Sequence, residues 1–332
     1  MLEQIILILD RGAVSFCHYD NAAYRAGVSE TMTRDVLASI VDYAGTNGLM
    51  LNVLFPDKPL PDGHLHLLEG VRHVKIVPFR LRKTYPESVP VLDWDSSGQA
   101  DGPPGANIDN VIVRLSGPQL PELRRVLRYL KGSARRINVT LTALQHLSDH
   151  NLQEYEHQLS EIVRLVAGWY VEGNMIELNF LSDRLFLRAM KNCDAGIRHI
   201  TFAPDGKFYI CPGFYHSSSP SDVGSLQSGI RIPNQELLEL SHAPICSRCD
   251  AYHCRRCVYL NKLTTRELNT PSRQQCVASH LERNASRRLV RRLKPSLTNF
   301  QELSDVPEID YLDPLDQLRE KRPPGQIELK LR

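Results

Sequence analysis

The sequence predicts an α/β protein with a parallel sheet of about six strands, followed by a smaller cysteine-rich domain. From residue 1 to about 190, short apolar runs alternate with longer amphipathic runs, which is the pattern of repeated βαβ units. Seven of the eight cysteines then lie between Cys193 and Cys276. Six strands suggest a partial (β/α) barrel, although an open sheet fits the same pattern.

Each expected strand is a short apolar run, and each expected helix is amphipathic. The strands are Ile5–Leu9, Met50–Phe55, Val74–Pro78, Asn110–Arg114, Ile137–Leu141 and Met175–Phe180. The helices are Thr31–Ala44, Leu120–Lys131 and Asn151–Tyr170. In the last helix, apolar residues from Leu152 to Val166 recur three and four positions apart, as one helix face requires. Residues 84–108 are rich in proline and glycine, so we expect a loop or insertion there.

After residue 190 the pattern changes. Ile197–Phe202 and Lys207–Ile210 flank Ala203-Pro204-Asp205-Gly206, which predicts a β-hairpin with a tight turn. A later helix is expected to begin at Thr270-Pro271, with Thr270 as its N-cap and Pro271 as its first helical residue. Scattered prolines beyond Lys294 predict an extended tail. We therefore expect domains at residues 1–190, 191–294 and 295–332.

Composition narrows the function classes. Hydrophobic residues make up 42% and charged residues 23% of the 332, which is typical of globular proteins. Forty Lys and Arg residues against 38 Asp and Glu give a net charge of +2, so the chain as a whole is no polycation for nucleic acid. No apolar run approaches the roughly 18–20 residues that span a bilayer, and we expect no membrane contact.

The N-terminus also bears on localisation. Its five consecutive apolar residues, Ile5–Leu9, follow no basic segment, so they predict a buried strand rather than a signal peptide. We therefore expect a cytoplasmic protein. In a reducing compartment, clustered cysteines indicate metal binding or redox chemistry rather than disulfides.

The cysteine spacing is the most specific pattern in the chain. It reads Cys193-x12-Gly206-x4-Cys211, then Cys246-x2-Cys249-x4-Cys254-x2-Cys257, then Cys276. A hairpin would bring Cys193 and Cys211 together at its open end. Seven thiolates are too many for one tetrahedral zinc and fit two metal centres. Zinc sites usually separate their two pairs by a dozen or more residues, so the four-residue gap here favours iron–sulfur clusters, with zinc as the alternative.

This pattern resembles the SPASM domain, the auxiliary-cluster module found behind many radical SAM peptide-modifying enzymes. The first half matches with its glycine, whereas the quartet is one residue shorter in two gaps than the usual Cys-x2-Cys-x5-Cys-x3-Cys. The resemblance implies two 4Fe–4S clusters, with their ligands divided as follows. One cluster would take Cys193, Cys211 and Cys257. The other would take Cys246, Cys249, Cys254 and Cys276.

The first implied cluster lacks a fourth cysteine ligand from this pattern. In relatives that have one, it follows shortly after the first cysteine. His199 is the nearby candidate for an extra ligand or a substrate contact, although it fits a solvent-facing strand position equally well. Without such a ligand, one iron would be open to water or substrate.

The front half lacks a motif that the resemblance would require for catalysis. Radical SAM enzymes carry Cys-x3-Cys-x2-Cys in the loop after the first barrel strand, but residues 10–19 hold only Cys17. If Cys17 takes the third position, Asp10 and Val14 take the other two, and valine cannot ligate iron. No Gly-Gly-Glu-type segment follows the second strand, where Phe55-Pro56-Asp57-Lys58 stands. We therefore expect no SAM binding. Cys17 is either a packed remnant or a contact for substrate or metal.

This combination is similar to a narrower family, the CXXX repeat peptide maturases. These resemble SPASM proteins without the radical SAM motif and accompany a true radical SAM maturase. The likeness covers roughly residues 1–294 and rests on Val14-Ser15-Phe16-Cys17-His18-Tyr19, Asn269-Thr270-Pro271-Ser272 and His280–Arg287. It implies a radical SAM maturase and a Cys-repeat precursor peptide as partners, and a component without autonomous SAM cleavage.

A basic run at Leu281–Lys294 holds six Lys and Arg residues against one glutamate. Such a helix contacts nucleic acid, a membrane face, an acidic partner or only solvent. No aromatic residues are interleaved, which disfavours nucleic acid. The candidates for partner binding are Arg287, Arg288, Arg291 and Arg292.

Two functions from different classes follow from these patterns. The first is an iron–sulfur partner protein that positions a ribosomally synthesised Cys-repeat peptide, relays electrons, or does both, beside an active radical SAM enzyme. The alternative is a zinc-stapled scaffold that binds a protein or nucleic acid through its basic helix. Metal analysis distinguishes them.

Overall fold

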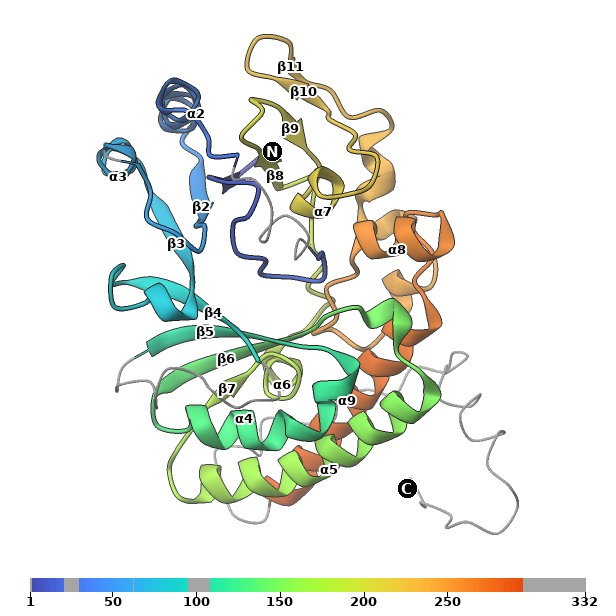
Figure 1. Ribbon diagram of the computed structural model, residues 1–332. Helices are drawn as coiled ribbons and strands as arrows, with labels where there is room; N and C mark the ends of the chain where they lie inside the picture. Colours follow the sequence, from blue (N-terminus) through green and yellow to red (C-terminus); the bar gives the residue numbers. More distant parts are fainter. Residues whose placement is uncertain (1, 21–29, 62, 95–107, 295–332) are drawn as a thin grey trace.

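The computed structural model describes residues 2–20, 30–61, 63–94 and 108–294. In these ranges one curved sheet of nine strands has the order β7-β6-β5-β4-β3-β2-β1-β8-β9. The strands are β1 (Gln4–Ile8), β2 (Met50–Leu54), β3 (His73–Pro78), β4 (Ser88–Asp93), β5 (Ile108–Leu115), β6 (Ala134–Leu141), β7 (Glu177–Leu178), β8 (His199–Phe202) and β9 (Phe208–Tyr209). Neighbours from β7 to β8 pair in parallel, and β9 is antiparallel to β8. Figure 1 shows the sheet curving from β9 and β8 through β2 and β3 to β7.

Helices lie on both the outer and the inner side of the curved sheet (Figure 1). They are α2 (Arg34–Thr46), α3 (His64–Leu68), α4 (Leu123–Leu130), α5 (Asp149–Val171), α6 (Asp183–Phe186), α7 (Pro212–Tyr215), α8 (Val258–Thr265) and α9 (Arg273–Leu293). Side chains fix the starts of the longer helices: Thr33 caps α2, Ser148 caps α5 through a capping box with Asn151, and Ser272 caps α9. Each satisfies a backbone N–H that has no partner within its helix.

Short elements complete the fold. A two-stranded ribbon joins β10 (Gly224–Ser225) to β11 (Gly229–Ile230). Short 3-10 helices lie at Phe79–Leu81, Gly117–Glu122, Leu144–His146, Gln235–Leu238, Leu240–His242 and Cys246–Arg248. The last begins at a cysteine of the quartet, so the first Cys-x-x-Cys pair is bent by a helical turn.

Three expectations from the sequence need correction. Residues 84–108 are not all loop, because β4 lies within them, while 95–107 fall outside the described residues. The sheet has nine strands instead of about six, since β4, β8 and β9 join it. The late helix begins at Arg273, because the Ser272 hydroxyl, rather than Thr270, accepts the hydrogen bond from the Gln275 backbone N–H. The expected tail at 295–332 also lies outside the described residues.

The two faces of β1 pack against different partners. Ile5 and Leu7 belong to an apolar cluster with residues of α2, whereas Ile6 and Ile8 belong to a cluster on the opposite face. This follows from the two-residue period of a strand. We call the second group the inner cluster: Ile6, Ile8, Ala13, Val14, Leu54, Ile76, Val91, Ile112, Ala203, Tyr209 and Tyr215. Its members include residues of the loop after β1 and of α7, so these two segments cover the inner face of the sheet.

The helix that follows the cysteine quartet packs against the front half of the chain. Leu281, Ala285 and Leu289 of α9 are buried in the same apolar cluster as residues of α5. The Tyr155 hydroxyl of α5 donates to Glu282 Oε1 at 2.6 Å, and Arg273 pairs with Asp149 at 2.8 Å.

The expected division of the chain into domains at residues 190 and 294 stays a prediction. Among the described helices, none combines the length and apolar character that crossing a membrane requires.

Candidate functional site

Three of the cysteines meet where the hairpin approaches α7 and α8. Cys193 and Cys211 lie before β8 and after β9, and Gly206 occupies the turn between those strands with φ of 76°. Cys211 and Cys257 are the N-cap residues of α7 and α8, and the Leu260 backbone N–H donates to Cys257 Sγ at 3.4 Å. Cys193, Cys211 and Val258 share one apolar cluster. We call Cys193, Cys211 and Cys257 the first thiol group.

A glycine sets the spacing between α7 and α8. A Cβ atom on Gly213 would lie 2.5 Å from Cγ and Cδ1 of Tyr259, and the Phe214 and Tyr259 rings pack edge to face with centroids 5.5 Å apart. Real Cβ atoms do not approach this closely, so only glycine allows this contact. The contact holds Cys211, two residues before Gly213, close to Cys257, two residues before Tyr259.

We expect Gly213→Ala to lower the free energy of unfolding by about 2 kcal/mol, because the added methyl group forces α7 away from the Tyr259 ring. Denaturant unfolding measures this change. Gly168→Ala is the control, since nothing lies within 4 Å of a Cβ at Gly168 in α5, and alanine there should stabilise the helix by about 0.5–1 kcal/mol. Equal stability of both variants would show that α7 and α8 do not depend on this contact.

In the first thiol group Cys211 is buried and Cys193 and Cys257 are half-buried, and the three thiols influence one another. Burial raises the pKa of Cys257 well above its ordinary value, and the charges of Cys193, Cys211 and Cys17 raise it further. Burial likewise raises the pKa of Cys211, with added contributions from Cys17 and Cys193. Thiolates at these positions would repel one another. A cationic group bound among them would remove this cost.

His199 contacts Cys193 through one ring nitrogen. Its Nε2 lies 2.7 Å from the Cys193 carbonyl oxygen and 3.7 Å from Cys193 Sγ. Because a carbonyl oxygen only accepts hydrogen bonds, Nε2 carries the proton and donates. Burial alone would raise the pKa of the Cys193 thiol, but the hydrogen bond and charge of His199 lower it below its ordinary value. His199 is therefore the hydrogen-bond donor in this pair, and its N–H group helps to orient Cys193.

The loop after β1 brings Cys17 to the same region. Burial raises the pKa of the Cys17 thiol to about 12, and the charge of Cys193 adds to the increase. Val14 is buried in the inner cluster. Asp10 is only 2% exposed, and it pairs with Lys58 Nζ at 2.9 Å and accepts a hydrogen bond from the Thr31 hydroxyl at 2.6 Å. Asp10 and Val14 thus have structural roles in the positions where a radical SAM motif would carry cysteines.

The other cysteines gather around α9. Burial raises the pKa of Cys246 to about 12, and the charges of Cys254 and Cys249 add to it. Cys249 Sγ lies 3.5 Å from His280 Nε2, and the Ser279 side chain hydrogen-bonds to Cys254. Ser279 and His280 follow Cys276 by three and four positions on α9, so all three lie on one helix face.

This arrangement brings Cys276 to the side of α9 that contacts Cys249 and Cys254. We call Cys246, Cys249, Cys254 and Cys276 the second thiol group. Sequence reasoning missed the contacts of Ser279 and His280. Ser279 and His280 follow Cys276 by three and four positions on an expected helix, and this spacing could have indicated that they lie near the cysteines.

A buried carboxylate lies beside the second thiol group. Asp250 has no exposed surface, and it pairs with Arg283 Nη1 at 2.8 Å and Arg287 Nη2 at 2.7 Å. Its backbone oxygen accepts a hydrogen bond from Arg184 Nε at 2.6 Å. Sequence reasoning missed Asp250 as well.

The basic run on α9 therefore differs from a solvent-facing helix. Arg287 is engaged with Asp250, and burial lowers the pKa of Arg288. Arg291 and Arg292 are exposed. Partner binding by Arg287, Arg288, Arg291 and Arg292 stays a prediction, with Arg287 already engaged inside the protein.

The donor chemistry of both groups suits iron–sulfur clusters. These take cysteine thiolates at several irons, so their ligands surround a volume instead of converging on one point. In the described ranges no three or more Cys, His, Asp or Glu side chains are placed to hold a metal ion, so the binding of a cluster by either group stays a proposal. Sulfur donors predominate in both groups, and each neighbouring histidine that contacts a thiol does so from 3.5 Å or more.

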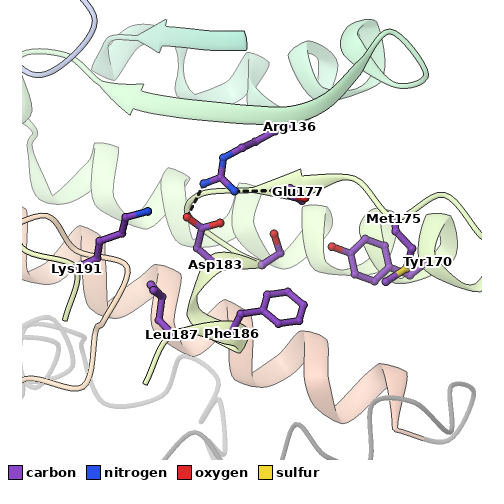
Figure 2. A pocket seen from close by; sticks show the side chains of 9 residues that line it. Arg136, Tyr170, Met175, Glu177, Asp183, Phe186, Leu187 and Lys191 are labelled. Carbon is purple, nitrogen blue, oxygen red and sulfur yellow. Dashed lines mark hydrogen bonds and ion pairs between the residues drawn. The ribbon is translucent and has the colours of Figure 1, made fainter. Parts of the chain in front are cut away.

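A separate pocket lies near the edge of the sheet (Figure 2). Its volume is about 470 Å³, and Arg136 crosses it to pair with Glu177 at 2.9 Å and Asp183 at 2.6 Å. The remaining lining residues are Tyr170, Met175, Ser182, Phe186, Leu187 and Lys191. No cysteine lines this pocket, so it is separate from both thiol groups.

Comparisons with known proteins identify the fold. No family model and no curated protein matches the sequence. Among solved structures, hexahistidine-tagged anSMEcpe with bound AdoMet matches with a TM-score of 0.57 and 12% identity over 91% of this chain and 98% of that one. Native anSMEcpe with bound AdoMet and Cp18Cys peptide matches with a TM-score of 0.55 and 13% identity, over 88% and 99% of the two chains. Since anSMEcpe is a radical SAM enzyme, this chain has a radical SAM-like fold.

Proposed function

We propose that this chain is an iron–sulfur partner protein in the maturation of a ribosomally synthesised Cys-repeat peptide, acting with a separate active radical SAM enzyme. The observation that carries the proposal is the pair of thiol groups on a radical SAM-like fold whose loop after β1 contains only one cysteine. The first group would hold one 4Fe–4S cluster and the second group another. When bound, such clusters supply one-electron transfer.

The residues after β1 and β2 support a role without SAM cleavage. Asp10 follows β1 and Lys58 follows β2, and their ion pair, together with Thr31, ties the two loops at the end of the sheet. Asp10 is already engaged by a cation and a hydroxyl group within the protein. The chain's remaining contribution would be to hold a peptide and two clusters in a fixed arrangement.

The peptide as substrate is supported by the comparison at the level of fold. The matched anSMEcpe structure holds a peptide together with AdoMet. A radical SAM-like fold that keeps a peptide-binding role and loses SAM cleavage would need an active enzyme as its partner. That partner and the Cys-repeat peptide are the two molecules we propose for this chain.

Metal analysis of the full chain, purified without oxygen, tests the proposal. We expect about eight iron per chain with broad absorbance near roughly 400 nm, and no 5′-deoxyadenosine when the chain is incubated with SAM and a reductant. Zinc without iron would support the zinc-stapled scaffold instead. Formation of 5′-deoxyadenosine by this chain alone would contradict the partner role.

A second experiment tests the peptide. A radical SAM maturase and a small Cys-repeat precursor peptide would be co-expressed with and without this chain. We expect a mass change of the peptide only when this chain is present. A peptide modified equally well in its absence would contradict the proposal.

A further inference from the structure

The pocket beside α6 is bordered by apolar side chains that solvent reaches. Met175 and Phe186 line it (Figure 2) and are 48% and 61% exposed. Val171, the neighbour of the pocket residue Tyr170, is 59% exposed. Exposed apolar residues are usually scattered singly over a protein surface, so three of them around one cavity indicate a place where another apolar group binds.

Exposed cations accompany this apolar surface. Arg188 and Lys191 follow Phe186 on the same short segment, and Lys191 lines the pocket. The Lys191 backbone N–H donates to the Tyr252 carbonyl oxygen at 2.9 Å, which places Arg255, three residues after Tyr252, in the neighbouring segment. In the part of the chain that the structure describes, the side chains of these three cations form no ion pair.

The carboxylates of the pocket already have a partner. Arg136 donates to Glu177 Oε2 at 2.9 Å and to Asp183 Oδ2 at 2.6 Å. A cationic occupant would therefore have to compete with Arg136 for both carboxylates. An occupant that carries carboxylates could pair with Arg188 and Lys191 at no such cost, so the charges favour an acidic occupant with apolar side chains.

The end of α9 lies close to this pocket. The Ser286 hydroxyl of α9 donates to the Leu181 carbonyl oxygen at 2.6 Å, and the next residue, Ser182, lines the pocket. The helix ends at Leu293, seven residues beyond Ser286, which is about 10 Å along its axis. The chain therefore continues beyond Lys294 from a point near the pocket.

The sequence beyond Lys294 has the chemistry that this surface would bind. Residues 295–332 lie outside the described residues, but their stretch Glu302–Asp316 has six Asp and Glu residues and no Lys or Arg. Apolar residues are interspersed among these acids: Leu303, Val306, Ile309, Tyr311, Leu312 and Leu315. Glu302 follows Lys294 by eight positions, and a chain of that length spans up to about 26 Å, so the stretch can reach the pocket.

We propose that Glu302–Asp316 binds to this pocket within the same chain. Its apolar side chains pack against Met175 and Phe186, and its carboxylates pair with Arg188 and Lys191. Because the stretch is tethered, its effective concentration at the pocket is on the order of millimolar, which favours it over a free peptide or a second copy. The inference goes beyond the proposed function and requires no metal.

Carbodiimide cross-linking of the full chain tests the inference, because this reagent joins a lysine ammonium and a carboxylate in contact with it as an amide without a spacer. After digestion and mass spectrometry we expect Lys191 linked to an acidic residue of Glu302–Asp316. Lys131 pairs with Glu172 at 3.2 Å, so their link is the internal reference for the folded chain. An equal mixture of unlabelled and isotope-labelled chains shows whether each link lies within one chain.

Substitutions at exposed positions distinguish binding in the pocket from a chance contact. Phe186→Ser should lower the yield of the Lys191 link about fivefold relative to the reference link, because it removes a large exposed apolar side chain. Leu65→Ser is the matched control, since Leu65 is 41% exposed in α3 between β2 and β3, away from the edge strand β7, and its yield should not change. Lys191→Arg should abolish the link and keep the charge.

The outcomes decide between the occupants. A Lys191 link to Asp183 alone, or no Lys191 link while the reference link forms, would overturn the inference. Links that join two chains in the labelled mixture would assign the pocket to a second copy and overturn it as well. Equal yields in the wild type and Phe186→Ser would show that the apolar surface takes no part, against the inference. None of these readouts depends on iron, so a chain without iron would contradict only the proposed function.

Discussion

Replacing Asp250 with alanine is expected to lower the free energy of unfolding by about 4 kcal/mol. The Asp250 side chain has no exposed surface, and it neutralises Arg283 and Arg287, of which Arg283 is only 5% exposed. The alanine variant would leave two guanidinium groups facing each other without their counterion. Chemical denaturation of the metal-loaded chain measures the change.

The control for Asp250 is another carboxylate that pairs with an arginine of α9. Asp149 contacts Arg273 at 2.8 Å, but their side chains are 38% and 28% exposed. Asp149→Ala should therefore cost less than about 1 kcal/mol, because solvent screens that pair. If the two variants lost equal stability, the burial of Asp250 would not be the cause.

Asp250 also connects stability to the second thiol group. It directly follows Cys249, and the Ala251 backbone N–H donates to Cys249 Sγ at 3.4 Å. Through Arg283 and Arg287 the same carboxylate fixes the face of α9 that carries His280. We therefore expect Asp250→Ala to retain fewer than eight iron, with the loss confined to the second cluster.

The strands could be predicted where an apolar run was long enough to stand out. Ile5–Leu9 and Ile137–Leu141 match β1 and β6 within a few residues. The strand β4 escaped because Pro90 interrupts a short run that lies among loop-forming residues. The pairing of β8 with β1 could not be predicted either, because it joins residues almost 200 positions apart and local patterns do not encode it.

For the candidate site, the spacing of the cysteines could be taken from the sequence, whereas the direction in which each side chain points could not. The cysteine pattern predicts which thiols form the two groups, and their role as metal ligands stays a prediction. It could not show that Arg287 turns inward, because the partner Asp250 lies 37 positions away. Cys17 illustrates the same limit, since one cysteine in a loop carries no metal spacing of its own. Its relation to Cys193 exists only once the loop packs against α7.

Cys254 and Cys257 are three residues apart, yet we expect their removal to damage different clusters. Cys254 contacts Ser279 of α9 and interacts with Cys249, whereas Cys257 caps α8 and interacts with Cys193 and Cys211. The short Cys-x-x-Cys segment would thus bridge two metal centres. A zinc site built from the quartet alone would instead place both residues on the same ion.

Three double variants distinguish these arrangements through iron content and electron paramagnetic resonance. Cys249→Ala/Cys254→Ala removes two ligands of the second group, and Cys211→Ala/Cys257→Ala removes two of the first. Each should retain about four iron, because a group that loses two of its ligands loses its cluster while the other group is untouched. The two variants should show the signals of different clusters.

The third variant, Cys254→Ala/Cys257→Ala, leaves each centre with all but one of its ligands. We expect both signals to change together, with more iron retained than in either of the other doubles. Loss of one signal and full retention of the other would mean that Cys254 and Cys257 serve the same centre.

Metal binding contributes to the free energy of folding, so thermal unfolding should follow the same order. The third double variant should unfold at a higher temperature than the two variants that lose a whole cluster. A third double that unfolds at the lowest temperature would mean that the segment from Cys254 to Cys257 stabilises the fold without dividing its ligands between two clusters.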